Sequence, residues 1–297
     1  MKRIILLFLV AAQLSCLRLD DNFFEPLEID EYKFDDYSGE VDFKLNTPFY
    51  NISDTFIHCF TIPSKSSDEE DATTIFAVYI GDLDSISKDT VIMYCHGNRD
   101  HMDFYWPRAK LLANTMSKMR FGVLMIDYRG YGKSHGKSTE SSLNTDVDAA
   151  LNWLKSNGLS DDRLIIYGFS MGSAPATNIA AYNYSMNPSK LMLEAPFSSA
   201  EMMVQDASGL AMPGDFVTDM KVENGEVIKH VKQPFFWIHG IDDDFLSIEN
   251  HGEVVYNNYN GIYKEQHRIP GADHSTIQTT MLYDNYLKIV GDFITKK

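Results

Sequence analysis

The amino-acid sequence predicts an α/β fold with a mainly parallel central sheet and helices on both of its faces. Beyond Lys88, short apolar segments of strand length alternate with longer amphipathic segments of helix length. Strands that are apolar along nearly their whole length are typical of a sheet buried on both faces. The 297 residues, of which 44% are hydrophobic, suffice for one large core, so we expect one domain with an N-terminal appendage.

Residues 1–16 have the pattern of a signal peptide. A basic start is followed by the apolar run 4–12 and by a small residue, Ser15, before Cys16. The run is too short to span a bilayer comfortably as a helix. The end of this segment resembles the lipobox of bacterial lipoproteins, in which the cysteine carries the lipid, although the two residues before Ser15 depart from the usual pattern.

We therefore expect export to the cell envelope, with membrane attachment through a lipidated Cys16. The alternative is ordinary cleavage, which would give a periplasmic or freely secreted protein. The formal charge of −16 makes nucleic acid an unfavourable partner, because the chain would repel phosphate backbones. The same charge gives no electrostatic attraction to anionic lipid headgroups.

Residues 17–55 form an acidic and aromatic N-terminal extension, which we expect to pack against an edge of the body through its aromatic side chains. The main domain is expected over 56–297. It begins with strand-like segments at 56–62 and 74–80, and the charged run between them predicts an exposed hairpin loop.

The alternating region predicts the remaining elements of the main domain. In order along the chain we expect a strand at 91–95, a helix near 105–119, a strand at 122–127, a helix near 141–156, a strand at 164–167, a helix near 174–184, strands at 191–194, 235–239 and 265–269, and a C-terminal amphipathic helix. Ligands of such sheets bind beyond the carboxyl ends of the strands. Cys59 and Cys95 fall in strand-like segments, so we expect two buried, inert thiols, and no Cys/His cluster has zinc-site spacing.

Residues 168–172 read Gly-Phe-Ser-Met-Gly and lie between an apolar, β-branched run and small, helix-compatible residues. This context predicts a strand, a sharp turn and a helix, with the hydroxyl of Ser170 raised at the turn. Gly168 and Gly172 would leave space for such a turn. The alternative is a glycine-rich connection without chemistry.

A nucleophilic serine needs an adjacent base, which a carboxylate usually orients. His274 lies in a turn-rich loop after the last expected strand, a place that suits a general base and acid. A solvent-exposed histidine without a role is the alternative. Asp242, Asp243 and Asp244 follow the preceding strand and are the candidate carboxylates.

Two further motifs carry a resemblance to a known family. His-Gly-Asn at 96–98 directly follows an expected strand, and Asp-Tyr-Arg-Gly-Tyr-Gly-Lys-Ser occupies 127–134. With the Gly-x-Ser-x-Gly segment, these motifs resemble serine hydrolases of the α/β-hydrolase superfamily that have a His-Gly-Asn oxyanion segment. The resemblance covers about residues 74–293 and implies the α/β-hydrolase fold.

The same resemblance implies a catalytic triad. Ser170 would be the nucleophile and His274 the base. The family's His-Gly-x-x-Asp loop, aligned on His239, places the acid on Asp243 rather than on its two neighbours.

The resemblance also implies an oxyanion hole, in which backbone N–H groups stabilise the charge that develops on a carbonyl oxygen. The donors would be the N–H of Met171 and one from Asn98 or Arg99. His96 and His239 would be structural.

In the segment 127–134 we expect Asp127 and Arg129 to form structural ion pairs. Its glycines are not followed by the spacing of a phosphate-binding P-loop. The resemblance also implies a small cap above Ser170 at about residues 198–233. The segment contains the apolar residues Met202, Met203, Leu210, Met212, Phe216, Val217 and Met220. They predict either an adaptable apolar acyl pocket or a small helical cap with its own core.

The sequence thus favours a serine hydrolase that cleaves carboxylic esters through an acyl-enzyme, with a small-molecule or lipid-like acyl substrate and no cofactor or metal. Thioesters, lipid acyl groups and peptides are less favoured substrates. Two alternatives stay open: a peptidase-type hydrolase of the same fold, and a hydrolase-fold binding protein of the envelope without catalysis. The acyl length and the oligomeric state are not indicated.

Overall fold

The computed structural model describes residues 23–66, 71–208 and 218–296, with the backbone alone at 207 and 208. The predicted signal peptide and Cys16 lie outside these ranges, and their roles stay predictions. Within the described part of the chain, no helix is both long enough and apolar enough to cross a membrane.

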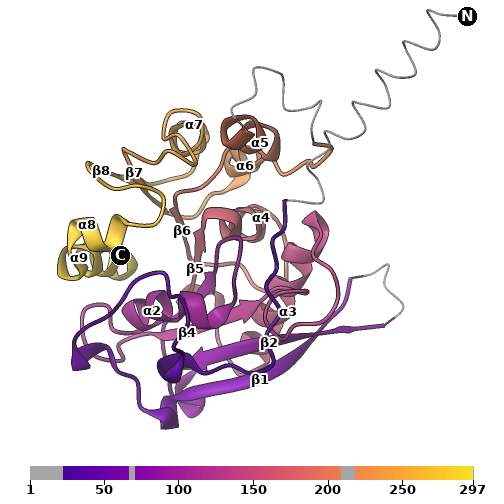
Figure 1. Ribbon diagram of the computed structural model, residues 1–297, viewed down its shortest axis with the longest axis vertical. Coiled ribbons are helices and arrows are strands. Elements are labelled where there is room, and N and C mark those ends of the chain that lie inside the picture. Colours follow the sequence, from indigo (N-terminus) through magenta and orange to yellow (C-terminus); the bar gives the residue numbers. More distant parts are fainter. Residues whose placement is uncertain (1–22, 67–70, 209–217, 297) are drawn as a thin grey trace, which may run out of the picture.

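The central sheet confirms the predicted fold class. Its eight strands in the described ranges lie in the order β1-β2-β4-β3-β5-β6-β7-β8 (Figure 1). They are β1 Ile57–Ser64, β2 Thr73–Ile80, β3 Val91–Cys95, β4 Gly122–Asp127, β5 Leu164–Phe169, β6 Lys190–Glu194, β7 Phe235–Gly240 and β8 Lys264–Ile269. The predicted hairpin β1–β2 pairs antiparallel, β2 pairs antiparallel with β4, and the other neighbours pair parallel.

Helices cover both faces of the sheet. The α-helices with their bounds are α2 Met102–Ala113, α3 Glu140–Ser156, α4 Ser173–Ala181, α5 Ala200–Ser208, α6 Asn224–Val227, α7 Gly252–Asn258, α8 Ile277–Met281 and α9 Tyr283–Thr295. In β5, Leu164 and Ile166 belong to the core that α3 and α4 cover, whereas Ile165 and Tyr167 belong to the core beneath α2 and α9. This alternation follows from the two-residue period of a strand.

Helix α4 ends at Ala181, three residues before its expected end, and two other expected helices end early or are divided where the backbone turns. α2 ends at Ala113, and Met116 and Met119 then adopt left-handed φ angles of 67° and 53°. The expected C-terminal helix is divided into α8 and α9 at Leu282, whose φ is 66°. A β-carbon crowds the backbone in this region of φ, so helices rarely continue through it.

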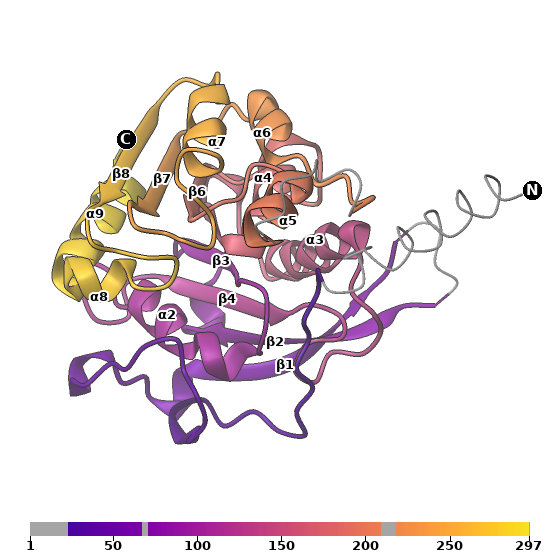
Figure 2. The same ribbon diagram turned by 45° about the horizontal axis from the view of Figure 1, so that its top comes forward.

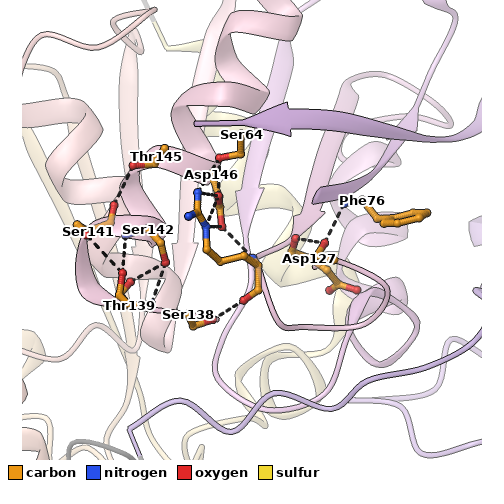
Figure 3. A network of polar contacts seen from close by, with 11 residues as sticks. Ser64, Phe76, Asp127, Ser138, Thr139, Ser141, Ser142, Thr145 and Asp146 are labelled. Atoms are coloured by element: carbon orange, nitrogen blue, oxygen red, sulfur yellow. Dashed lines mark hydrogen bonds and ion pairs between the residues drawn. The ribbon is translucent and has the colours of Figure 1, made fainter. Parts of the chain in front are cut away.

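A buried network fastens the turn after β4 to α3 and the edge strand β1 (Figure 3). The carboxylate of Asp146 on α3 accepts from the guanidinium of Arg129 at 2.9 Å, from its backbone N–H at 2.8 Å and from the hydroxyl of Ser64 at 2.6 Å. The expected pairing of Asp127 with Arg129 is therefore wrong. Asp127 instead accepts from the hydroxyl of Tyr32 at 2.6 Å, because the extension brings that residue to the end of β4.

The N-terminal extension lies along α2 and the ends of the strands. In Figures 1 and 2 its described part is the indigo trace that passes β4 and α2. Aromatic packing holds it, with the rings of Phe34 and Trp106 4.8 Å apart, and so do polar contacts. Asp35 accepts from the indole of Trp106, and Asp42 pairs with the buried Arg108. Its acidic residues therefore anchor the extension as much as its aromatic residues do.

The two cysteines of the body have different surroundings. Cys95 is buried in β3, and burial raises the pKa of its thiol. Cys59 is exposed, so its predicted burial is wrong. The reason is the face of its strand, since side chains alternate between the two faces, and in β1 Cys59 and Thr61 are exposed whereas Ile62 lies in the core.

Candidate active site

The candidate residues gather at the carboxyl ends of neighbouring strands. Ser170 directly follows β5, and the His-Gly-Asn segment follows β3, which pairs with β5. Asp243 follows β7, and His274 follows its neighbour β8. Parallel strands end at the same edge of a sheet, so residues far apart in sequence meet there.

The turn at Ser170 has the strained geometry that its sequence predicts. The 3₁₀ turn Ser170–Gly172 joins β5 to α4, and Ser170 has a φ of 51°, which side chains other than glycine rarely adopt. A β-carbon on Gly168 would lie 2.5 Å from the carbonyl oxygen of Gly172. A β-carbon on Gly172 would lie 2.1 Å from the carbonyl oxygen of Cys95. Both glycines are therefore needed for the close approach of this turn to β3 and α4.

Ser170, His274 and Asp243 form one continuous hydrogen-bonded chain. His274 Nε2 lies 2.9 Å from Ser170 Oγ, and His274 Nδ1 lies 2.8 Å from Asp243 Oδ2. The rings of Phe169 and Phe245 flank the imidazole at centroid distances of 5.3 and 5.1 Å. This is the arrangement in which a carboxylate orients a histidine toward a serine hydroxyl.

Asp243 is distinguished from its neighbours by burial and by bonding. Its side chain is fully buried, whereas Asp242 and Asp244 are exposed. Asp243 Oδ1 accepts from the backbone N–H groups of Phe245 and Leu246, at 3.1 and 2.7 Å. Burial alone would raise the pKa of Asp243, but hydrogen bonds from His239 and His274, together with the Leu246 N–H, outweigh it and hold this pKa well below its ordinary value.

His239 is a partner of Asp243 that the sequence does not reveal. Its Nε2 lies 3.0 Å from Asp243 Oδ2 and 3.0 Å from the carbonyl oxygen of Leu246. The ring is fully buried at the end of β7. His239 therefore helps to hold the loop that carries Asp243.

The segment after β3 is held from several sides. His96 is fully buried, with Nδ1 2.8 Å from the carbonyl oxygen of Gly97 and Nε2 3.3 Å from Asp127. A β-carbon on Gly97 would lie 3.1 Å from the ring of Phe169, so the segment lies directly beside the residue before Ser170. Asn98 and Met171 both line the cavity above Ser170, as does Arg99.

A cavity of about 550 Å³ opens above Ser170. Residues of the main domain that line it include Phe104, Tyr105, Phe169, Phe245 and Ser275. The α5 helix of the expected cap contributes Met203 and Val204. Met203 and Met220 both pack against the core as well. Four of the other apolar residues expected in this cap lie outside the described residues, namely Leu210, Met212, Phe216 and Val217.

The extension supplies a part of this cavity that sequence reasoning missed. Phe23, Glu25, Glu40 and Asp42 all line it. The acidic and aromatic composition of the extension indicates packing against the body, but composition does not tell where the extension lies. Among the described residues, no three His, Cys, Asp or Glu side chains form a group that could hold a metal ion.

Comparisons with known proteins agree with the architecture. A family model described as alpha/beta hydrolase fold matches residues 90–213. Protein bem46 of Schizosaccharomyces pombe is 27% identical over 229 residues, covering 76% of this chain and 74% of that protein. Protein ABHD12B of Homo sapiens is 29% identical over 228 residues, covering 70% of this chain and 61% of that protein. The match therefore spans less than two thirds of the human relative.

Solved structures share the fold at low sequence identity. The Pyrococcus furiosus esterase Pf2001 is similar with a TM-score of 0.67 and 18% identity, covering 92% of this chain and 98% of that chain. The esterase EaEST from Exiguobacterium antarcticum has a TM-score of 0.58 and 16% identity, covering 80% and 99%. The chain therefore has the α/β-hydrolase fold.

Proposed function

We propose that the protein is a serine hydrolase that cleaves carboxylic esters. The observation that carries this proposal is the hydrogen-bonded chain from Ser170 Oγ through His274 to Asp243, with the serine opening into a cavity. The hydrolase fold supports the reaction class. Thioesters and peptides follow as less favoured substrates of the same chemistry.

In the proposed reaction, Ser170 Oγ attacks the carbonyl carbon of the ester while His274 Nε2 takes the hydroxyl proton. Asp243 stabilises the imidazolium that forms, and its lowered pKa keeps it ionised for this task. The backbone N–H of Met171 and that of Asn98 or Arg99 stabilise the tetrahedral oxyanion.

His274 then gives the proton to the leaving alcohol oxygen, and the carbon–oxygen bond of the ester breaks. An acyl group remains on Ser170 Oγ. A water molecule, deprotonated by His274, attacks this acyl carbon, and the carboxylic acid and the free serine are released. Protons and bonds therefore balance over acylation and deacylation, and the ester and water are the reactants.

The cavity favours a small or medium acyl ester. Its volume of about 550 Å³ lies within the range of roughly 300–1,000 Å³ that is usual for small-molecule sites. Aromatic rings and the thioether of Met203 offer apolar contact, and carboxylates stand at several points of the lining. We infer that the acyl group binds between the rings and the cap helix α5.

An active-site serine probe tests the proposal directly. A fluorophosphonate should label the protein at Ser170, and a series of nitrophenyl esters should be hydrolysed in a chain-length-dependent manner. Ser170→Ala should abolish both signals, because it removes the hydroxyl that lies beside His274 Nε2. An unlabelled wild type, or hydrolysis by Ser170→Ala at the wild-type rate, would contradict the function.

A further inference from the structure

We propose that the side chain of Asn98 is a positioning residue that docks the N-terminal extension onto the oxyanion segment and so fixes the N–H donors above Ser170. The proposal rests on the proposed function, because it concerns the donors of that reaction. It assigns the extension a part in catalysis that neither its composition nor its distance in sequence indicates.

The amide of Asn98 pairs with the extension backbone as one strand pairs with another. Its Nδ2 donates to the carbonyl oxygen of Phe23 at 3.0 Å, and its Oδ1 accepts from the N–H of Glu25 at 3.1 Å. The two contacts use both ends of one planar amide, so the side chain has a single orientation. The partners belong to alternate residues of the extension, about 73 to 75 positions earlier in the chain.

A tyrosine hydroxyl completes the bonding of this amide. Tyr131 donates to Asn98 Oδ1 at 2.5 Å, and the same hydroxyl lies 3.7 Å from the sulfur of Met171. Tyr131 therefore contacts the side chains of both Asn98 and Met171, and so links the oxyanion segment to the turn that carries Ser170.

The backbone at Asn98 is held as firmly as its side chain. The hydroxyl of Tyr105 donates to the carbonyl oxygen of Asn98 at 2.7 Å. The next two residues, Arg99 and Asp100, have left-handed φ angles of 68° and 58°. Two successive side chains in this region are unfavourable and persist only where the surroundings impose the turn. The docked extension is part of those surroundings.

The docked residues also form the wall of the cavity. The ring of Phe23 is buried and packs edge-on against Phe197 at 6.2 Å, and the carboxylate of Glu25 lies 2.7 Å from Arg99. Both side chains line the cavity above Ser170. One contact therefore places the cavity wall and the oxyanion segment relative to each other.

Oxyanion donors work only within a narrow range of positions, since the charge they stabilise exists in the transition state alone. Loosening Asn98 should therefore lower kcat and leave KM nearly unchanged. A residue that only supported the fold would instead lower the fraction of folded protein and leave kcat per active site unchanged.

The sharpest variant is Glu25→Pro, which removes the N–H that Asn98 accepts. Its reference is Glu25→Ala, which loses the same carboxylate and keeps the N–H. We expect kcat per titrated site to be about 10-fold lower in Glu25→Pro than in Glu25→Ala, less than the 10²–10³-fold loss of a whole donor, with KM within about threefold. Fluorophosphonate titration supplies the concentration of sites, and affinity for a boronic acid that imitates the tetrahedral state should fall in parallel.

Asn98→Asp tests the docking role if the Glu25→Pro variant does not fold. It keeps the size of the side chain and turns the amide donor into an oxygen that faces the Phe23 carbonyl, so kcat should fall by a similar factor. Equal kcat per site in Glu25→Pro and Glu25→Ala, or wild-type kcat in a folded Asn98→Asp, would overturn the docking role while the esterase proposal stands. A wild type that is neither labelled nor active would overturn both.

Discussion

An asparagine in place of Asp243 could not accept from all the hydrogen-bond donors that surround this side chain. Each of its oxygens faces two donors: Oδ1 faces the N–H groups of Phe245 and Leu246, and Oδ2 faces the rings of His239 and His274. An asparagine would turn its NH₂ toward one of these pairs in either orientation. Two donors would then meet two more donors, and one pair would lose its bonds.

We predict that Asp243→Asn lowers kcat by on the order of 10³–10⁴-fold, as expected when the histidine loses its orienting carboxylate. Asp242→Asn and Asp244→Asn, whose side chains are exposed, should keep kcat within about twofold. Steady-state kinetics of the three variants on one nitrophenyl ester make the comparison. A large loss in either neighbour would place the acid elsewhere in the loop.

Some residues of this site can be predicted from the sequence, and others cannot. The turn at Ser170 is predictable because its two glycines and its flanking strand and helix all serve one local geometry. His274 is predictable from chain order. The selection of Asp243 among three adjacent aspartates needs a resemblance, because burial in a loop leaves no periodic pattern. The bond from His239 to Asp243 is visible only in three dimensions.

At the scale of elements, the cap helix α5 is tied to the loop region after β7. Asp206 of α5 accepts from the hydroxyl of Ser247 at 2.8 Å and lies 3.2 Å from Nε2 of the buried His251. The backbone N–H of Ser198 donates to the other nitrogen of that ring at 3.1 Å. Burial lowers the pKa of His251 to about 4, against the opposing charge of Asp206. The imidazole is therefore neutral in the folded state above that pH.

This shift predicts a loss of stability in mild acid. Between pH 6.5 and 4 the unfolded chain binds a proton at His251 that the folded chain does not, so the free energy of unfolding falls as the pH falls. The full loss is on the order of 3 kcal/mol. His251→Gln should flatten this slope in urea unfolding, whereas exchange of the exposed His135 should not. An unchanged slope in His251→Gln would show that other groups cause it.

The sequence predicts the bounds of the strands more closely than it predicts the contacts of the N-terminal extension. The parallel strands are predicted within one or two residues, and for those before β8 the reason is that apolar runs of five or six residues between turns have few other interpretations. The extension is different. Its contacts with Asp103, Trp106 and Arg108 join residues about 70 positions apart, and pairing of that range has no local signal.

At the scale of the whole molecule, charge should select among substrates. The protein has a net charge of −16, and Glu25, Glu40, Asp42 and Asp100 line the cavity. Glu25 pairs with Arg99 and Asp42 with Arg108, and no ion pair of Glu40 or Asp100 occurs among the described residues. Burial raises the pKa of Asp100, and the Glu40 carboxylate adds to this effect, whereas His101 and Arg99 oppose it.

We predict that esters with an anionic acyl group are poor substrates. A hemisuccinate ester should have a kcat/KM about 10-fold below that of a neutral ester of equal length, because the cavity repels its carboxylate. The difference should shrink in high salt, which screens charges over a shorter distance. Glu40→Gln should raise kcat/KM for the anionic ester alone. Equal rates for both esters at low salt would show that the carboxylates do not reach the acyl site.

The order in which the sheet is assembled has a consequence for when activity can appear. The nucleophile at Ser170 follows a central strand, whereas Asp243 and His274 follow the last two strands in sequence, and Phe23 closes the cavity from the beginning of the described chain. No continuous fragment shorter than about residues 23–274 contains all of these groups. The proposed hydrolysis therefore needs the chain through His274, and a nascent chain that ends before β8 would have the turn at Ser170 without its base.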